Sequence, residues 1–102
     1  MSNAQIFQQI TKRLKKVDDD FADEFAKEFE DRVAQRTPVD TGHLRASWDT
    51  RVSSSQITIS NDAEYAGYVE EGTEYMEGAH MLKTTMSEIP EIAKVALNRI
   101  KK

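Results

Sequence analysis

The 102-residue chain contains no cysteine, so disulfide bonds and thiolate metal sites are excluded. It has no apolar run near the roughly 20 residues that a membrane-spanning helix needs. Residues 1–9 lack the apolar stretch of a signal peptide. The formal net charge of −4 argues against a general affinity for nucleic acid. We therefore expect a single domain over residues 1–102, without a membrane anchor, that works in the cytoplasm or in a particle assembled there.

The first third of the chain has a helical pattern. Its apolar residues recur at steps of three and four, at Ile6, Ile10, Leu14, Val17, Phe21, Phe25, Phe29 and Val33. Asn3 can cap the start of the helix. Thr37-Pro38 ends it, because the residue before a proline is disfavoured in helical conformation. The pattern predicts a helix over residues 3–36.

A helix of this length would span about 50 Å at 1.5 Å per residue. A compact domain of 100 residues has a radius of gyration of only about 13 Å. The helix must therefore break, for which Asp18-Asp19-Asp20 is the natural point, or protrude. We expect it to protrude, with another subunit covering the excess of its apolar stripe.

The middle of the chain changes to a period of two. Trp48, Thr50 and Val52 share one face of an extended segment, and Ile57 and Ile59 share one face of the next. A polar turn lies between the two segments. This pattern predicts a β-hairpin over residues 47–61.

The remaining segments are mainly helical. Tyr65, Tyr68 and Val69 have helical spacing and predict a short helix over residues 63–71, which Gly72 can cap. Residues 74–79 are expected to form a loop, with a strand as the weaker alternative. A C-terminal helix is predicted over residues 80–101, where Pro90 either kinks it or begins its second part. The order of helix, hairpin, short helix and helix indicates an α+β fold.

Charge is segregated along the chain. Residues 12–16 hold four bases, and residues 18–31 hold eight acids and one lysine. Residues 61–77 hold six acids and no base, whereas the last nine residues hold four bases. These stretches are either solvated surfaces or patches that meet between neighbouring subunits.

Asp40-Thr41-Gly42 matches the short signature of aspartic proteases. That chemistry needs two aspartates in a nearly all-β fold, whereas this motif follows a long helix and precedes a helical turn. A structural role fits better, because Asp40 or Thr41 can cap a short helix and Gly42 permits a close approach to the preceding chain. Leu44 should then point inward, and Arg45 outward or to a carboxylate.

Other catalytic or binding interpretations are weaker. A Ser47–His43–Asp40 triad would lack the glycine-rich surroundings of a nucleophile elbow. His43 and His80 lack the spacing of paired metal ligands. Trp48 and the nearby tyrosines have few bases around them, which favours packing over base stacking. We therefore expect no enzyme activity, no cofactor, no metal and no sequence-specific nucleic acid.

Two motifs resemble a family of small tailed-phage proteins described as minor tail, tail-completion or head–tail joining proteins. The first is Pro-Val-Asp-Thr-Gly-His-Leu-Arg-Ala-Ser in residues 38–47, and the second is Tyr-Ala-Gly-Tyr-Val-Glu-Glu-Gly-Thr in residues 65–73. The resemblance covers roughly residues 36–86. After Thr73 the chain departs from the proline- and arginine-rich run of many relatives.

The resemblance implies an N-terminal helix, a small sheet and a C-terminal helix. It also implies a structural subunit of the virion neck or tail, assembled as a homo-oligomeric ring, often of six copies, with other neck or tail proteins as partners. The matching positions carry no catalytic role and are expected to serve as scaffold and assembly residues: Pro38, Asp40, Thr41, Gly42, Leu44, Arg45, Ser47, Asn61, Tyr65, Ala66, Tyr68, Glu70, Gly72 and Thr73.

Two further expectations follow. Glu70 and Glu71 are expected at a subunit contact, and Trp48 is expected to pack between the hairpin and the first helix. The alternative function is a small prophage-encoded adaptor that acts as a dimer. Species of six or more copies would favour the ring, whereas dimers would favour the adaptor.

Overall fold

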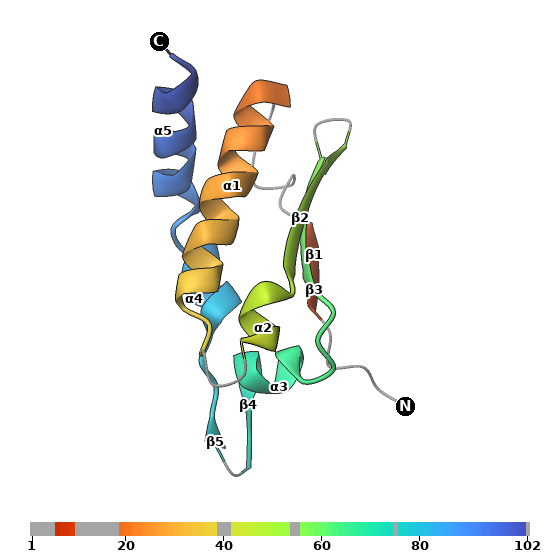
Figure 1. The fold of residues 1–102 in the computed structure, drawn as a ribbon. Coiled ribbons are helices and arrows are strands. Elements are labelled where there is room, and N and C mark those ends of the chain that lie inside the picture. Colours follow the sequence, from red (N-terminus) through yellow and green to blue (C-terminus); the bar gives the residue numbers. More distant parts are fainter. Residues whose placement is uncertain (1–5, 10–18, 39–41, 54–55, 75, 102) are drawn as a thin grey trace.

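The computed structural model describes residues 6–9, 19–38, 42–53, 56–74 and 76–101. The fold is α+β, as the sequence predicts, with a helical layer on one face of a small antiparallel sheet (Figure 1). The elements in chain order are β1 (Ile6–Gln9), α1 (Asp19–Gln35), α2 (His43–Ala46), β2 (Trp48–Ser53), β3 (Gln56–Asn61), α3 (Ala66–Glu71), β4 (Gly72–Thr73), β5 (Met76–Glu77), α4 (Met81–Met86) and α5 (Ile89–Ile100).

The prediction of one helix over residues 3–36 is wrong at its N-terminal end. Residues 6–9 form β1, which pairs with β3 in antiparallel register from Ile6 opposite Asn61 to Gln9 opposite Thr58. Pairing with β3 gives the backbone of this segment hydrogen-bond partners in the sheet, and such tertiary pairing overrides a local helical pattern. Residues 10–18 lie outside the described residues.

The helix α1 begins at Asp19, within the aspartate run that was the alternative break point. Asp19 and Asp20 lie in its first turn, where negative charge interacts favourably with the helix dipole. Its 17 residues span about 25 Å, half the length that the continuous helix would have.

The apolar stripe of α1 is covered by the same chain. Phe25, Phe29 and Val33 are completely buried, because α1 lies between the sheet and α5 (Figure 1). The expectation that this helix protrudes and needs another subunit to cover it is therefore wrong for residues 19–35.

The hairpin predicted over residues 47–61 is confirmed as β2 and β3. Trp48 lies opposite Asn61 and Val52 opposite Ile57, so every second residue of both strands shares one face, from which the Thr50 hydroxyl donates to Glu30 of α1. Ile57 and Ile59 are completely buried, whereas the intervening Asp49 and Arg51 of β2 are exposed. The three-stranded sheet has the order β1-β3-β2.

The C-terminal helical region consists of two helices rather than one over residues 80–101. Residues 87–88 separate α4 from α5, and Pro90 stands in the first turn of α5. Proline is tolerated there because the first backbone N–H groups of a helix have no partner within it, whereas inside a continuous helix it would break a hydrogen bond. Pro90 thus begins the second part, one of the two predicted outcomes.

Two other predicted boundaries change. The short helix covers residues 66–71 rather than 63–71, and residues 74–79, expected as a loop, contribute β5 to a small antiparallel pair with β4. This β4–β5 arm extends from the end of the molecule that also carries α2 and α3 (Figure 1). Among the described residues, no helix is long and apolar enough to cross a bilayer.

Candidate functional site

The two sequence motifs come together at the end of the molecule formed by α2, α3 and the arm. The first hydrogen-bonded contact at this end joins Thr37, just after α1, to Trp48 at the start of β2. The buried Thr37 hydroxyl donates a hydrogen bond to the Val33 carbonyl oxygen at 2.7 Å. The same hydroxyl accepts the indole N–H of Trp48 at 2.8 Å. Trp48 is therefore packed between the hairpin and α1, as expected, with its polar atom satisfied.

The short helix α2 follows a left-handed turn. Gly42 has a φ of 73° and stands at the N-cap without a side-chain hydrogen bond. A Cβ at this position would meet no atom within 4 Å, so the expected close approach to the preceding chain is wrong. Glycine fits here because other residues are strained at positive φ. Asp40 and Thr41, the expected capping residues, lie outside the described residues.

The side chains of α2 divide as predicted. Leu44 is buried and Arg45 is exposed. The Ser47 hydroxyl donates to the main-chain oxygen of His43 at 2.7 Å, so this hydrogen bond serves the C-terminal turn of α2 and not the His43 ring. The geometry therefore shows no nucleophile–base pair between Ser47 and His43.

Asn61 links the first motif to the second. It is completely buried, and its side-chain amide donates to the Leu44 carbonyl oxygen at 2.9 Å. Its side-chain oxygen accepts the backbone N–H of Ala63 at 3.0 Å. This turn after β3 explains why α3 begins at Ala66 instead of Ala63.

Glu70 holds α3 against α4. Its side chain is buried, and its two carboxylate oxygens accept the backbone N–H groups of Leu82 at 2.8 Å and Lys83 at 2.9 Å. These groups belong to the first turn of α4, whose own N-cap residue, His80, makes no side-chain capping bond. Glu70 therefore caps a helix that belongs to a later part of the chain.

The base of the β4–β5 arm is fixed at the same junction. Gly72, with a φ of 88°, ends α3 as predicted. The Ala79 N–H donates to the Val69 carbonyl oxygen at 2.7 Å, and the His80 N–H donates to the Glu70 carbonyl oxygen at 3.1 Å. A Cβ on Gly78 would lie within 3 Å of backbone atoms of residues 70 and 71.

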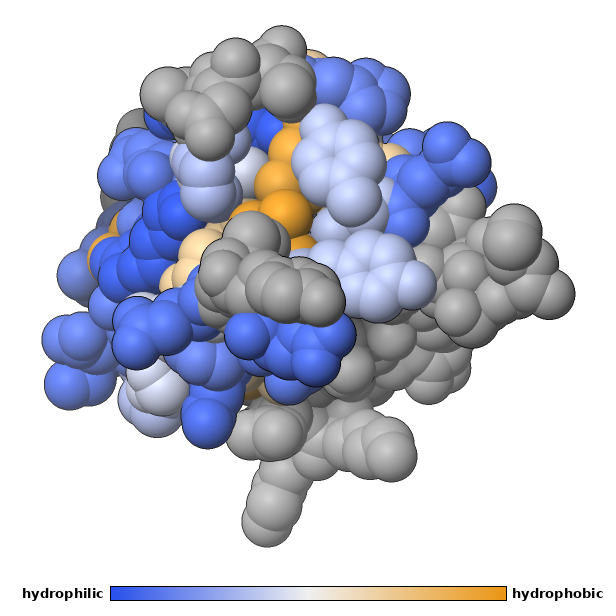
Figure 2. Space-filling model, turned by 90° about the horizontal axis from the view of Figure 1, so that it is seen from below, coloured by the Kyte–Doolittle hydropathy of each residue, from blue (hydrophilic) through white to orange (hydrophobic). Residues whose placement is uncertain are grey.

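Other motif residues lie at the surface of this end. Pro38, Arg45, Tyr68 and Thr73 are exposed, and the Tyr68 side chain has 49% of its surface accessible. Tyr65 is half-buried, with its ring centroid 6.3 Å from that of His43. Figure 2 looks onto this end and shows a hydrophobic area bordered by hydrophilic residues.

Glu71 differs from its neighbour Glu70. It is exposed, whereas Glu70 makes its side-chain hydrogen bonds inside its own chain. Of the two glutamates expected at a subunit contact, only Glu71 is therefore available at the surface.

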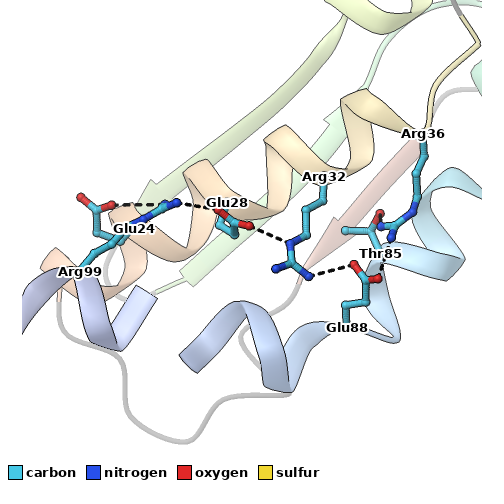
Figure 3. A network of polar contacts seen from close by, with 7 residues as sticks. All are labelled: Glu24, Glu28, Arg32, Arg36, Thr85, Glu88 and Arg99. Atoms are coloured by element: carbon cyan, nitrogen blue, oxygen red, sulfur yellow. Dashed lines mark hydrogen bonds and ion pairs between the residues drawn. The ribbon is translucent and has the colours of Figure 1, made fainter. Parts of the chain in front are cut away.

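A second polar cluster joins α1 to α4 and α5 (Figure 3). Arg36 pairs with Glu88 at 2.6 Å, and Arg32 bridges Glu88 at 3.1 Å and Glu28 at 2.8 Å. Arg99 of α5 pairs with the same Glu28 at 2.8 Å. The sequence did not reveal this network, because charge counts do not show which helix faces meet.

The network shifts the titration of its carboxyl groups. Hydrogen bonding from Arg32 lowers the pKa of Glu28 against the opposing effect of burial, and Arg99 adds to the lowering. Hydrogen bonding from Arg36, with a further contribution from Arg32, lowers the pKa of Glu88. The charged forms of both glutamates therefore stabilise the helical layer.

Neither histidine is part of a metal site in the described structure. His43 and His80 are both exposed and belong to different segments. Throughout the ranges that the structure describes, no group of three or more histidine, cysteine, aspartate or glutamate side chains could hold a metal ion. What the geometry does show is a hydrogen-bonded junction between α2, α3 and α4, with Tyr68 and Glu71 exposed at its surface.

A comparison with protein families identifies the class of protein. Residues 4–72 match the family described as "Bacteriophage HK97-gp10, putative tail-component". The match covers more than half of the chain and includes almost all of both motifs, so the chain belongs to this family of phage tail components. Comparisons with curated proteins and with solved structures give no match.

Proposed function

We propose that the chain is a structural subunit at the neck or tail end of a tailed-phage particle, where several copies form a ring during head–tail joining or tail completion. The observation that carries this proposal is the division of the motif residues at one end of the molecule. The buried members, such as Glu70 and Asn61, make their hydrogen bonds within the chain. Exposed members such as Tyr68 and Arg45 are available to neighbours.

Open backbone edges also favour assembly. In the described sheet, β1 and β2 are the outer strands, and unpaired strand edges invite association with another chain. The β4–β5 arm consists of two strands of two residues each and projects from the α3 end (Figure 1). A closed ring covers such edges while limiting further growth.

The motif residues accordingly take two roles in this proposal, and none is catalytic or binds a metal or cofactor. The scaffold residues hold the junction together: Gly42, Leu44, Ser47, Asn61, Tyr65, Ala66, Glu70 and Gly72. The assembly residues contact neighbouring subunits or other tail proteins: Pro38, Arg45, Tyr68 and Thr73.

The decisive experiment removes this gene from a phage or inducible prophage that carries it and examines the particles by electron microscopy. Full heads beside free tails are expected if the protein joins heads to tails, and aberrant or missing tails are expected if it completes the tail. Supplying the intact gene from a plasmid is the control and should restore particles. Normal, infectious particles without the gene would contradict a structural role in the virion.

The mass of the purified chain in solution distinguishes the ring from the alternative adaptor. Species of six or more copies are expected for the ring. A stable dimer at all protein concentrations would favour the adaptor, because a closed two-fold contact leaves no surface for further copies.

A further inference from the structure

Two large hydrophobic side chains are exposed among the described residues, and they lie far apart. Tyr68 belongs to α3 and is 49% exposed, and Leu97 belongs to α5 and is 45% exposed. In Figure 1, α3 lies next to the β4–β5 arm, whereas Leu97 belongs to the last turns of α5, toward the opposite end of the molecule. Neither residue can cover the other within one copy of this fold.

Tyr68 is surrounded by negative charge. Glu64 precedes it by four positions, in the turn that leads into α3, and Glu71 follows it by three, one helical turn away. Both carboxylates are exposed. Residues 52–82 contain six acids and no lysine or arginine. This acidic patch, defined as Glu64, Tyr68 and Glu71, therefore favours a positively charged partner.

Leu97 has the opposite surroundings. Lys94 precedes it by three positions, and Lys101, at the C-cap of α5, follows it by four. Both lysines are exposed. Residues 94–101 contain no acid, and their other base, Arg99, is paired with Glu24 and Glu28 of α1. This basic patch, defined as Lys94, Leu97 and Lys101, favours a negatively charged partner.

The two patches match in spacing as well as in charge. Each has a central hydrophobic residue with charges three and four positions away, so the outer charges of both patches have the same separation along the chain. When Tyr68 packs against Leu97, this spacing along the chain lets the flexible lysines turn toward the carboxylates of Glu71 in α3 and of Glu64 in the turn before it. Within the described part of the chain, none of these four charged side chains forms an ion pair.

We propose that the acidic patch of one copy binds the basic patch of the next copy. This contact is head-to-tail, because it joins two different surfaces, and such contacts generate rings when the rotation between copies closes. The inference rests on the proposed ring function and assigns the surfaces that build the ring. A single contact between two helix faces is small, so it is weak alone and gains strength when every copy makes two such contacts.

The absence of cysteine allows a direct test with introduced disulfides. Purified Tyr68→Cys and Leu97→Cys chains are mixed at high concentration and oxidised. Oxidation should form disulfides between position 68 of one chain and position 97 of another, and we call such a disulfide the 68–97 link. This link is expected in excess over 68–68 and 97–97 links. A chain with both substitutions should give a ladder of linked species. The matched control replaces Tyr68→Cys with Glu77→Cys, which places an exposed thiol on the arm at the same end.

Charge reversal provides the second arm of the test. Adding Glu64→Lys and Glu71→Lys to the Tyr68→Cys chain should lower the yield of the 68–97 link about tenfold, since that factor corresponds to about 1.4 kcal/mol over two surface pairs. Adding Lys94→Glu and Lys101→Glu to the Leu97→Cys chain should restore the yield. Circular dichroism of each variant confirms that it remains folded.

Equal yields for the 68–97 link and for the control 77–97 link would overturn the proposed contact. The proposed function is judged separately, from the mass of the unsubstituted chain and from the particles. If the unsubstituted chain forms rings but the cysteine variants give no excess of the 68–97 link, this contact is refuted while the proposed ring stands. A chain that forms neither rings in solution nor part of a particle would refute both.

Discussion

The interaction of Glu70 with α4 gives the sharpest prediction about stability. Glu70→Ala removes the carboxylate that accepts the Leu82 and Lys83 N–H groups, and the first of these two hydrogen bonds is buried. Loss of a helix cap costs about 0.5–2 kcal/mol, and a buried N–H group left without a partner costs about 1–3 kcal/mol. We therefore expect the free energy of unfolding to fall by about 2–4 kcal/mol.

Thermal and urea unfolding of the purified chain measure this loss. For a domain near 100 residues, 1 kcal/mol corresponds to about 4–8 °C, so the melting temperature should fall by roughly 8–32 °C. Glu70→Gln should have an intermediate effect, because the amide retains one acceptor oxygen and presents an NH₂ group to the second donor.

Glu71→Ala is the matched control, since Glu71 is the next residue of α3 and is exposed. An exposed substitution without a specific interaction changes stability by no more than about 0.5 kcal/mol. Equal, small effects of Glu70→Ala and Glu71→Ala would mean that the capping of α4 by Glu70 does not contribute to the stability of the fold.

Three further predictions concern other anchors. Trp48→Phe should lower the free energy of unfolding in urea by about 1–2 kcal/mol, because it keeps an aromatic side chain in the core but removes the N–H group that donates to the Thr37 hydroxyl. No loss would mean that this hydrogen bond is energetically neutral. The lowered pKa values of Glu28 and Glu88 predict a stabilisation that is present above the ordinary glutamate pKa of 4.5 and is lost as the pH falls through the lower folded-state values. Melting temperatures between pH 7 and pH 3 should therefore fall less for Glu88→Gln than for the unsubstituted chain, and parallel curves would contradict the network. Gly78→Ala should destabilise the chain more than Gly42→Ala, which costs about 1 kcal/mol for its positive φ, because a Cβ on Gly78 would overlap the backbone oxygen of Glu70. The reverse order in thermal unfolding would refute this packing.

The features that were predictable from the sequence depend on local patterns. The alternation of Trp48, Thr50 and Val52 identifies a strand, because it reflects burial on one face of a sheet. The position of Pro90 marks the start of α5 for a similarly local reason, the missing N–H of proline. The family resemblance in residues 38–47 and 65–73 is likewise a matter of short motifs, and the family match over residues 4–72 agrees with it.

The features that were missed depend on pairings between distant segments. The strand β1 exists as the partner of β3, in the second half of the chain, and its own sequence fits a helical stripe equally well. The role of Glu70 requires knowing that α4 turns back toward α3. For Gly42 the sequence predicts a close approach, whereas its neighbours leave open space and only its backbone angle requires glycine. Spacing along the chain does not contain this information.

The central position of α1 has a consequence for how the molecule opens. The sheet packs on one side of α1 and α5 on another, so the amides of its buried residues, such as Phe25 and Phe29, meet solvent only when these layers separate, although Asp23, Lys27 and Asp31 face solvent. Hydrogen–deuterium exchange should therefore be slowest in α1 and should report the global free energy of unfolding. The β4–β5 arm lies outside these layers, so its amides should exchange by small local openings. A neighbouring chain could thus reshape the arm while the helical layer remains closed.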